Sequence, residues 1–315
     1  MAAVWCGAVM RSAIVSNRRI TGLSADVLAE LVAEVGPLWQ ARHKARLAAR
    51  PRKRAVGAGA KHRLVFVDRL VATLVHLRHG VTHDVLACWF EVDRSTITRA
   101  VGEIRPLLAE RGCTVGPGVR LCTLAEVVEY LGVTGATGII DGTEVRVRRP
   151  RVGSRDRNAF ISGKSRQNAV KSMVVTDDAG RVLWCSPTVP GNCADITHAR
   201  QLGLVGLLRS GPVVQILADA GYQGLGAQTG GRVVTPPTRK FKKNAPDWYE
   251  AIYQQQRKAH SSRRIRVEHG IAHLKNWRSL SRHLGRREHM SHTVQAVAGL
   301  LSLQQTKNLL TAQKV

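Results

Sequence analysis

The sequence has 315 residues, with 48 Lys and Arg residues against 22 Asp and Glu residues and a formal net charge of +26. A hydrophobic content of 44% excludes a disordered tail, and no apolar run approaches the about 20 residues of a membrane span. The six cysteines form no CxxC pair, which excludes a zinc-ligand array of that spacing and favours a reducing compartment. We therefore expect a soluble, cytoplasmic protein that has no membrane partner.

The positive charge bears on the binding partner rather than on the fold. An excess of Lys and Arg along a whole globular chain favours nucleic acid as that partner. A ribosome-associated protein and the compositional bias of a GC-rich coding region are the alternatives. The apolar stretch at residues 1–19 is interrupted by Arg11 and has no basic segment ahead of it, so we expect no signal peptide there.

From about residue 23 to residue 112 the apolar residues recur with helical periodicity. A first helix is expected over 23–43, with Ser24 as its N-cap, and a basic Gly/Ala-rich loop follows at 49–63. Thr82 and Asp93 stand where N-caps belong in the segment after this loop. Three further helices are expected at about Leu64–Arg78, Thr82–Phe90 and Arg94–Ala109.

The last two of these helices have the dimensions of a helix-turn-helix. We expect the first of them to turn Val85, Leu86 and Trp89 inward, and the second to pack Ile97, Val101 and Ile104 and to expose Arg94, Ser95, Thr96, Thr98 and Arg99. Polar and basic residues at the start of the second helix suit base edges and phosphates in a major groove. Arg94, Thr96 and Arg99 are therefore the predicted DNA contacts. An ordinary three-helix bundle with a solvated face is the alternative.

From about residue 137 the periodicity changes to that of strands. Residues 138–150 alternate apolar and charged side chains, two strands are expected at about 168–176 and 181–189, and a turn with Asp and Gly joins them. A helix at about 195–208 and an apolar strand at 213–219 follow. Helices at about 247–260, from about 261, and at about 291–312 complete the chain. A basic, Pro-bearing connector, residues 235–246, precedes these helices and is either a solvated loop or a DNA contact. The order of elements predicts an α/β fold with a mixed sheet.

Four carboxylates occupy chemically suggestive places in this layout. Asp141 lies in or after the first strand, Asp195 starts a helix, Asp219 ends an apolar strand and Glu268 lies on the long C-terminal helix. Residues so far apart in the chain meet only over the sheet, and carboxylate oxygens suit Mg²⁺ or Mn²⁺ rather than zinc. Each Asp taken singly also suits a turn or an N-cap. Three further acids are not expected to be metal ligands. Glu144 faces away from Asp141, and Asp177 and Asp178 belong to the hairpin turn.

The helix that carries Glu268 has a charged stripe beside an apolar one. At 100° per residue, Ser261, Arg264, Glu268 and Lys275 fall within about 60° of one another. The neighbouring apolar stripe consists of Val267, Ile271 and Leu274. The pattern suits a metal ligand flanked by cations that hold phosphates. A solvated ladder of salt bridges is the alternative.

These residues carry a resemblance to a known family. Over about residues 64–303 the chain resembles a DDE transposase of the insertion-sequence 5 type, a DDE superfamily endonuclease with an N-terminal helix-turn-helix. The resemblance rests on the segments "DGTEVRVRRP", "NAFISGKSRQNAVK", "PGNCADIT", "ADAGYQG" and "RRIRVEHGIAHLKNWR". Arg264, Glu268 and Lys275 are similar to the R-x3-E-x6-K core of a signature in related transposases. Ser261 stands where that signature usually has Tyr, and Ala194 stands where His often precedes the Asp.

The resemblance implies a ribonuclease-H-like mixed sheet with flanking helices, preceded by an all-α helix-turn-helix domain. It implies Asp141, Asp219 and Glu268 as the catalytic and metal-binding triad, Asp195 as a fourth acid, and Arg264 and Lys275 as phosphate-binding residues. Mg²⁺, which Mn²⁺ is able to replace, is the implied cofactor. The implied partner is double-stranded DNA, at the element ends and at the target. A homodimer or a larger assembly is expected on DNA, in the cytoplasm and nucleoid of a bacterium.

The expected function is that of an insertion-sequence transposase that binds terminal inverted repeats, cleaves DNA with two metal ions and transfers strands. A non-catalytic DNA-binding regulator descended from a transposase is one alternative. A metal-dependent endonuclease without strand transfer is another, since both activities use the same carboxylates. The chain is expected to divide into five regions. They are a helical region with a basic linker (1–60), the helix-turn-helix (61–112), a connector (113–136), the catalytic domain (137–304) and a tail (305–315).

Overall fold

The computed structural model describes residues 17–49, 63–154, 156–239, 246–283 and 285–313. Three predicted segments fall wholly or largely outside these ranges. They are the apolar N-terminal stretch, the basic loop after the first helix and the Lys-rich part of the connector before residue 246.

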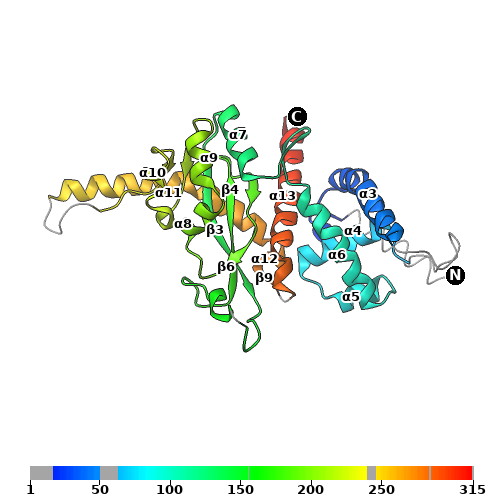
Figure 1. Ribbon diagram of the computed structural model, residues 1–315. Helices are drawn as coiled ribbons and strands as arrows, with labels where there is room; N and C mark the ends of the chain where they lie inside the picture. The colour runs from blue at the N-terminus through cyan, green and yellow to red at the C-terminus, as the bar shows by residue number, and fades with distance from the viewer. Residues whose placement is uncertain (1–16, 50–62, 155, 240–245, 284, 314–315) are drawn as a thin grey trace.

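A mixed sheet forms the centre of the C-terminal part of the chain (Figure 1). Its central strand β3 (Gly138–Val147) is antiparallel to β4 (Ala169–Thr176) and parallel to β7 (Ile216–Leu217). The outer strands are β5 (Val182–Cys185) beside β4, and β8 (Val233–Val234) beside β7. Two short strands, β6 (Val189–Pro190) and β9 (Arg282–His283), pair with β4 and β3. The alternation predicted for β3 is confirmed, because Thr143, Val145 and Val147 are buried while Arg146 is exposed.

Helices cover both faces of the sheet. On one face α7 (Leu124–Thr134), α8 (Asp195–Gln201) and α9 (Leu204–Ser210) enclose a core with the buried side chains of Ile140, Met173 and Leu183. On the other face lie α11 (Asp247–Lys275) and α13 (Met290–Ala312), whose Leu274 and Val294 share a core with β3 and β4. Short elements complete this part: α10 (Leu225–Gln228), α12 (Arg278–Ser281), and the 3₁₀ turns η1 (Arg157–Phe160), η2 (Ala220–Tyr222) and η3 (Arg287–His289).

The N-terminal part is helical, as expected from its periodicity. It contains α2 (Arg18–Thr21), α3 (Ala25–Ala48), α4 (Phe66–His79), α5 (His83–Trp89) and α6 (Arg94–Glu110). Ser24, Thr82 and Asp93 are N-caps as predicted, although only the Thr82 side chain accepts a capping hydrogen bond. Helix α13 lies between this part and the sheet (Figure 1), so that α3, α4, α6 and the sheet share one hydrophobic core.

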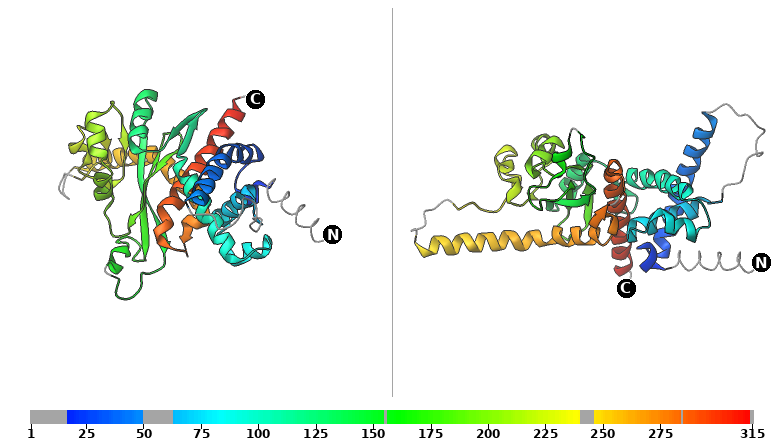
Figure 2. Two further views of the ribbon diagram at one scale, coloured as in Figure 1. Left: turned by 45° about the vertical axis from the view of Figure 1, so that its right-hand side comes forward. Right: turned by 90° about the horizontal axis from the view of Figure 1, so that it is seen from below.

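Three features differ from the predicted layout. The expected connector contains a hairpin, β1 (Cys113–Gly116) with β2 (Val119–Leu121), as well as α7. The single helix expected at 195–208 is two helices, because Gly203 adopts a positive φ of 77° between them. The two helices expected around residue 260 are one continuous helix, α11, since neither Pro nor Gly interrupts residues 247–269. The first half of α11 extends away from the body of the protein (Figure 2).

Among the described residues, no helix combines the length and the apolar character that a membrane crossing requires.

The contact between α6 and α13 depends on a glycine. A Cβ atom on Gly299 would lie 2.6 Å from the carbonyl oxygen of Gly112, which is backbone and has little freedom to move. We expect Gly299→Ala to lower the free energy of unfolding by about 1–3 kcal/mol because of this overpacking. Chemical denaturation measures the change. Gly102→Ala on the exposed side of α6 is the control, because a Cβ there meets nothing within 4 Å and replacing a helical glycine stabilises by up to about 1 kcal/mol. Equal stabilities of the two variants would contradict the prediction.

Candidate active site and DNA-binding face

Asp141 lies on β3, and Asp219 follows the end of the neighbouring parallel strand β7. The strand expected over 213–219 is shorter than predicted, because only Ile216 and Leu217 form it. Gly138 pairs with Ile216 and Ile139 with Leu217, so the same register carried two residues further brings Asp141 opposite Asp219. Each Asp is fixed by a local hydrogen bond: Asp141 Oδ1 accepts from the Gly142 amide at 2.7 Å, and Asp219 Oδ1 accepts from the Gly221 amide at 2.8 Å. The apolar strand before Asp219 therefore ends by placing this carboxylate beside the one from β3.

Asp195 approaches the same place from α8. Its helix is capped by Ala194, so Asp195 is the first helical residue and the interpretation of Asp195 as a simple N-cap is wrong. A Cβ on Gly142 would lie 2.6 Å from Asp195 Oδ1, and a Cβ on Gly221 would lie 3.2 Å from Asp195 Oδ2. The glycine that follows Asp141 and the one two residues after Asp219 therefore leave the space that the third carboxylate occupies.

The three carboxylates influence one another electrostatically. The pKa of Asp141 is raised to about 6, chiefly by burial and also by the negative charges of Asp219 and Asp195, whereas Arg264 opposes the shift. Burial also raises the pKa of Tyr222, and the negative charges of all three aspartates add to this rise. Such a group of like charges favours a bound cation.

Two cations of the protein contact this cluster. The Arg264 guanidinium of α11 lies 3.2 Å from Asp141 Oδ2, and the Lys171 ammonium of β4 lies 3.1 Å from Asp195 Oδ1. Lys171 also donates a hydrogen bond to the Cys193 carbonyl at 2.9 Å. Asp195 Oδ1 is buried, and its contact with the Lys171 ammonium is an ion pair without hydrogen-bond geometry. Lys171 was not among the predicted site residues, although it is a single lysine within the apolar strand 169–176.

Glu268 and Lys275 are not part of this contact network. Helix α11 is anchored by Val267, which packs on Ile139 and Leu217, and this places Arg264 over Asp141. Glu268 lies one turn after Arg264 on the flank of the helix. Its side chain is exposed, and no hydrogen bond or ion pair joins it to another described residue. Lys275 is exposed near the end of the helix. Within the described ranges, no three His, Cys, Asp or Glu side chains converge closely enough to hold a metal ion as they stand.

The acids excluded in the sequence analysis have other structural roles. Glu144 accepts hydrogen bonds from the hydroxyl groups of Ser162 and Ser165. Asp177 is buried in the turn between β4 and β5, where it accepts from the Ala179 and Arg181 amides and pairs with the Arg181 side chain. Asp178 is exposed in the same turn.

The carboxylate cluster has the donor chemistry that a divalent metal ion requires. Its ligands are all oxygen, the set that Mg²⁺ and Mn²⁺ prefer. One of these oxygens, Asp195 Oδ1, is buried without a hydrogen bond, and the neighbouring Gly142 and Gly221 keep the space around it free of side chains. Asp141, Asp195 and Asp219 are thus the residues that would hold the ion, with Glu268 the nearest further acid along α11.

The helix-turn-helix of α5 and α6 is formed, but one detail of its packing was predicted wrongly. Ile97, Val101 and Ile104 are buried as expected. On α5 only Leu86 of the three predicted residues is buried, whereas Val85 is 43% and Trp89 is 50% exposed. Ala87 and Phe90 provide the buried contacts instead, because the short helix presents a different side to α4 and α6. Arg94 and Arg99 are exposed and Thr96 is half-buried at the start of α6.

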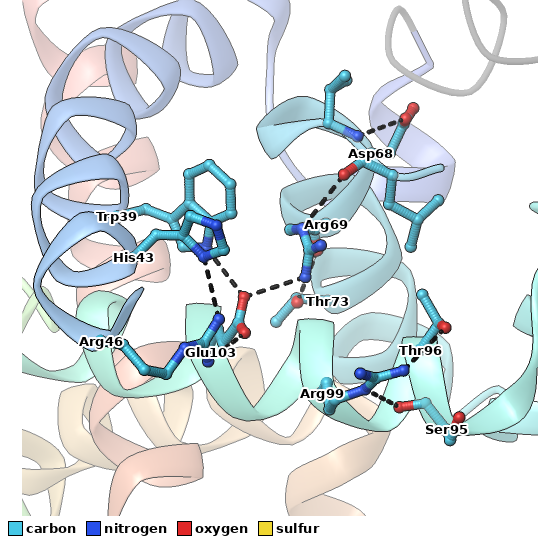
Figure 3. Close-up of polar contacts among 12 residues, drawn as sticks. Trp39, His43, Arg46, Asp68, Arg69, Thr73, Ser95, Thr96, Arg99 and Glu103 are labelled. Carbon is cyan, nitrogen blue, oxygen red and sulfur yellow. Dashed lines mark hydrogen bonds and ion pairs between the residues drawn. The ribbon is translucent and has the colours of Figure 1, made fainter. Parts of the chain in front are cut away.

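A half-buried carboxylate holds α6 against α3 and α4. Glu103 accepts hydrogen bonds from Trp39 Nε1 at 3.0 Å, from Arg46 at 2.7 Å and from Arg69 at 3.0 Å (Figure 3). Arg99 lies one turn earlier, and among the described residues it donates hydrogen bonds within its own helix alone, to the Ser95 carbonyl and the Thr96 hydroxyl. The network fixes the orientation of α6 and leaves Arg99 accessible at its N-terminal end.

Comparison with known proteins identifies the family. The sequence model of the DDE superfamily endonucleases matches residues 140–302, which is more than half of the chain. The chain belongs to the DDE superfamily endonucleases. The model of the helix-turn-helix of this superfamily matches residues 62–114. The resemblance found in the sequence is thus confirmed, together with the ribonuclease-H-like mixed sheet and the helix-turn-helix. Members of this superfamily are nucleases that in general depend on divalent metal ions.

Two individual proteins are similar to the chain. A protein named as the candidate transposase of insertion sequence element IS112, from Streptomyces albus G, is 27% identical over 227 residues, which cover 72% of this chain and 75% of that protein. The crystal structure of the Mos1 strand transfer complex contains a chain that is 14% identical. That match covers 82% of this chain and 81% of the other, at a TM-score of 0.18, which is too low to support any structural argument.

The raised pKa of Asp141 predicts how a neutral replacement affects stability. The folded protein binds the Asp141 proton more tightly than the unfolded chain does, so ionisation of this carboxylate costs stability as the pH rises from about 4 to about 6. We expect Asp141→Asn to raise the free energy of unfolding by up to about 3 kcal/mol at pH 7.5 in the absence of metal. At pH 4 we expect no change in this free energy. Urea denaturation in EDTA measures both values.

The matched control for this prediction is Asp177→Asn. Asp177 is also buried, but its carboxylate has three donors, so its neutralisation should lower stability at pH 7.5. An Asp141→Asn variant that is destabilised at pH 7.5 but not at pH 4 would contradict the prediction and show that the ion pair with Arg264 outweighs the burial of the carboxylate.

Proposed function

We propose that this protein is the transposase of a bacterial insertion sequence. It binds the terminal inverted repeats of its element through the helix-turn-helix, cuts the DNA at their ends and joins the freed 3′ ends to target DNA. It acts on DNA in the bacterial cytoplasm and nucleoid. The observation that carries the proposal is the convergence of Asp141, Asp195 and Asp219 from β3, α8 and β7 at one edge of the sheet. The family match and the similarity to the IS112 protein support the same activity.

In this proposal Asp141, Asp219 and Glu268 are the catalytic triad, and Asp195 is a fourth metal ligand. Two divalent ions, Mg²⁺ or Mn²⁺, would supply a nucleophile activated at neutral pH and neutralise the charge of the leaving oxygen. Glu268 is exposed and follows Arg264 by one turn on α11, and in this proposal its carboxylate joins the cluster when metal ions and DNA are bound.

The cations around the cluster have roles that follow from their positions. Arg264 holds Asp141 in the free protein and is placed to bind a phosphate once the carboxylates have another counter-ion. Lys275 lies further along the same helix, exposed and available for the DNA backbone. Lys171 of β4 forms an ion pair with Asp195 and restrains its carboxylate.

DNA recognition is assigned to the start of α6. Arg94, Thr96 and Arg99 are accessible there, on a helix whose orientation Glu103 fixes. Two element ends have to be brought together before strand transfer, so a dimer or a larger assembly forms on the DNA. The divisions of the chain proposed from the sequence, with the helix-turn-helix at 61–112 and the catalytic domain at 137–304, assign each of these roles to one region.

The catalytic role of Asp219 is tested by cleavage of the protein's own DNA. Wild type and Asp219→Asn are incubated with a supercoiled plasmid that carries the flanking DNA of the gene, in Mg²⁺, Mn²⁺ or EDTA. We expect metal-dependent breaks at the flanks with the wild type and at least about a 100-fold loss in the variant, because catalysis of this kind depends on charge neutralisation. The Asn side chain retains the oxygen that accepts from the Gly221 amide, so the fold should remain intact.

Asp178→Asn is the control for this assay. Asp178 is exposed in the turn between β4 and β5, so this variant should cleave DNA like the wild type. Sequencing of the products detects joining of the cut ends to new DNA. Binding without cleavage under every metal condition would refute the transposase and favour the non-catalytic regulator. Cleavage without any joined product would favour the endonuclease.

The role of the α6 surface is tested by the salt dependence of DNA binding. We expect Arg99→Ala to weaken binding to the flanking duplex and to reduce the slope of log K against log salt by about 1, because one phosphate contact is lost. Fluorescence anisotropy in EDTA measures both quantities. The control is Arg209→Ala on α9, an exposed arginine that lies on the far side of the sheet from α6. An unchanged slope for Arg99→Ala would remove this residue from the interface.

A further inference from the structure

One buried arginine lacks the partner that the others have. Arg69, Arg105 and Arg111 are all buried. Arg69 pairs with Glu103 at 3.0 Å, and Arg111 pairs with Glu34 at 2.9 Å. Arg105 is 7% exposed and forms no hydrogen bond or ion pair with any described residue, and its Nε is fully shielded from solvent. A guanidinium removed from water without an acceptor is costly, so buried arginines are nearly always paired.

The surroundings of Arg105 contain several imidazole rings. Four histidines lie within its electrostatic reach: His76 of α4, His83 of α5, His283 of β9 and His289 of η3. Burial lowers the pKa of all four, and the positive charge of Arg105 lowers it further, so that the pKa of His83 and of His283 falls to about 4. At neutral pH these four imidazoles are therefore uncharged, and Arg105 carries the positive charge of the group.

The acids nearest to this group are already paired. Asp84 lies 3.4 Å from Arg94, and Glu288 contacts Arg287. Each of three histidines uses one ring nitrogen: His76 bonds the Val81 carbonyl, His83 bonds the Thr98 hydroxyl and His283 bonds the Arg286 carbonyl. Among the described residues, the second nitrogen of each of these rings has no partner, so the group retains hydrogen-bonding capacity for a ligand.

The position of Arg105 indicates which anion it meets. At 100° per residue, Arg94, Thr98 and Arg105 fall within about 40° of one another on α6. The line runs from the exposed start of the recognition helix, past the His83–Thr98 contact, to the junction with β9 and η3. Exposed Arg282 and Arg286 lie at this junction. A DNA backbone that follows the start of α6 would meet the same line, and a guanidinium binds two phosphate oxygens at once.

We propose that Arg105 and the surrounding histidines form a phosphate-binding site at the junction of the helix-turn-helix and the sheet, and that its ligand is a backbone phosphate of bound DNA. The site deepens the proposed function and depends on its DNA-binding part only. It lies away from the carboxylate cluster, so its test requires no metal and no cleavage.

The test compares Arg105→Met with Arg105→Lys and with Arg111→Met in the full chain, in EDTA. We expect Arg105→Met to bind the flanking duplex about tenfold more weakly and with a salt slope smaller by about 1. Its Tm should equal or exceed that of the wild type, because a buried charge without a partner is removed. Arg105→Lys should retain the slope but bind more weakly than the wild type, since the two-oxygen contact is lost. Arg111→Met should lower the Tm and leave the slope unchanged, because it breaks an internal ion pair.

A second arm of the test uses inorganic phosphate, to distinguish a DNA backbone phosphate from free phosphate as the ligand. Stabilisation of the wild type by phosphate, beyond that by chloride at equal ionic strength, and its loss in Arg105→Met would place the anion site at Arg105. If the DNA slope of Arg105→Met were unchanged in spite of this, the ligand would be free phosphate and the DNA assignment would be overturned. A lower Tm with an unchanged slope would show a structural role and overturn the site altogether. A wild type that does not bind the duplex at all would instead refute the proposed function, whatever phosphate does.

Discussion

Repulsion between like charges is the constraint on which the site depends. Three carboxylates share one edge of the sheet, and burial with mutual repulsion raises the pKa of Asp141. The fold holds them together with rigid and local means: the parallel register of β3 and β7, two glycines that make room for Asp195, and single contacts from Arg264 and Lys171. The stability lost in this arrangement is the common cost of a site prepared for a cation.

The recognition helix and the catalytic sheet share one core, and this determines how they cooperate. Helix α13 packs on α6 through the close approach at Gly299 and on the sheet through Val294 and its neighbours. Glu103 in turn fixes α6 to α3 and α4. In the proposed function, DNA bound at the start of α6 would therefore be held in a defined position relative to the carboxylates. The junction with β9 and η3, where Arg105 lies, is between these two regions.

Local patterns in the sequence predicted the parts of the structure that depend on neighbours along the chain. The alternation in β3 and the apolar run that ends at Asp219 were sufficient to find both strands and both aspartates. The interior face of α5 was not predictable, because a seven-residue helix fits a core with more than one side, and Phe90 took the place expected for Trp89. Lys171, Arg105 and β9 depend on contacts between residues distant in the chain, which no periodicity encodes. The side chain of Glu268 is exposed, so the sequence motif assigns it a role that contacts within the free protein do not reveal.

Because α11 is one continuous helix, an insertion or deletion has different consequences in its first and second halves. Its second half is anchored through Val267, Gly270 and Leu274, while the first half extends from the body. A residue inserted or deleted in the extended half would lengthen or shorten the helix and leave Arg264 above Asp141. The same change between Arg264 and Val267 would rotate Arg264 by about 100° away from the sheet. The outer half is thus free to vary in length among related proteins, whereas the inner half has a fixed register.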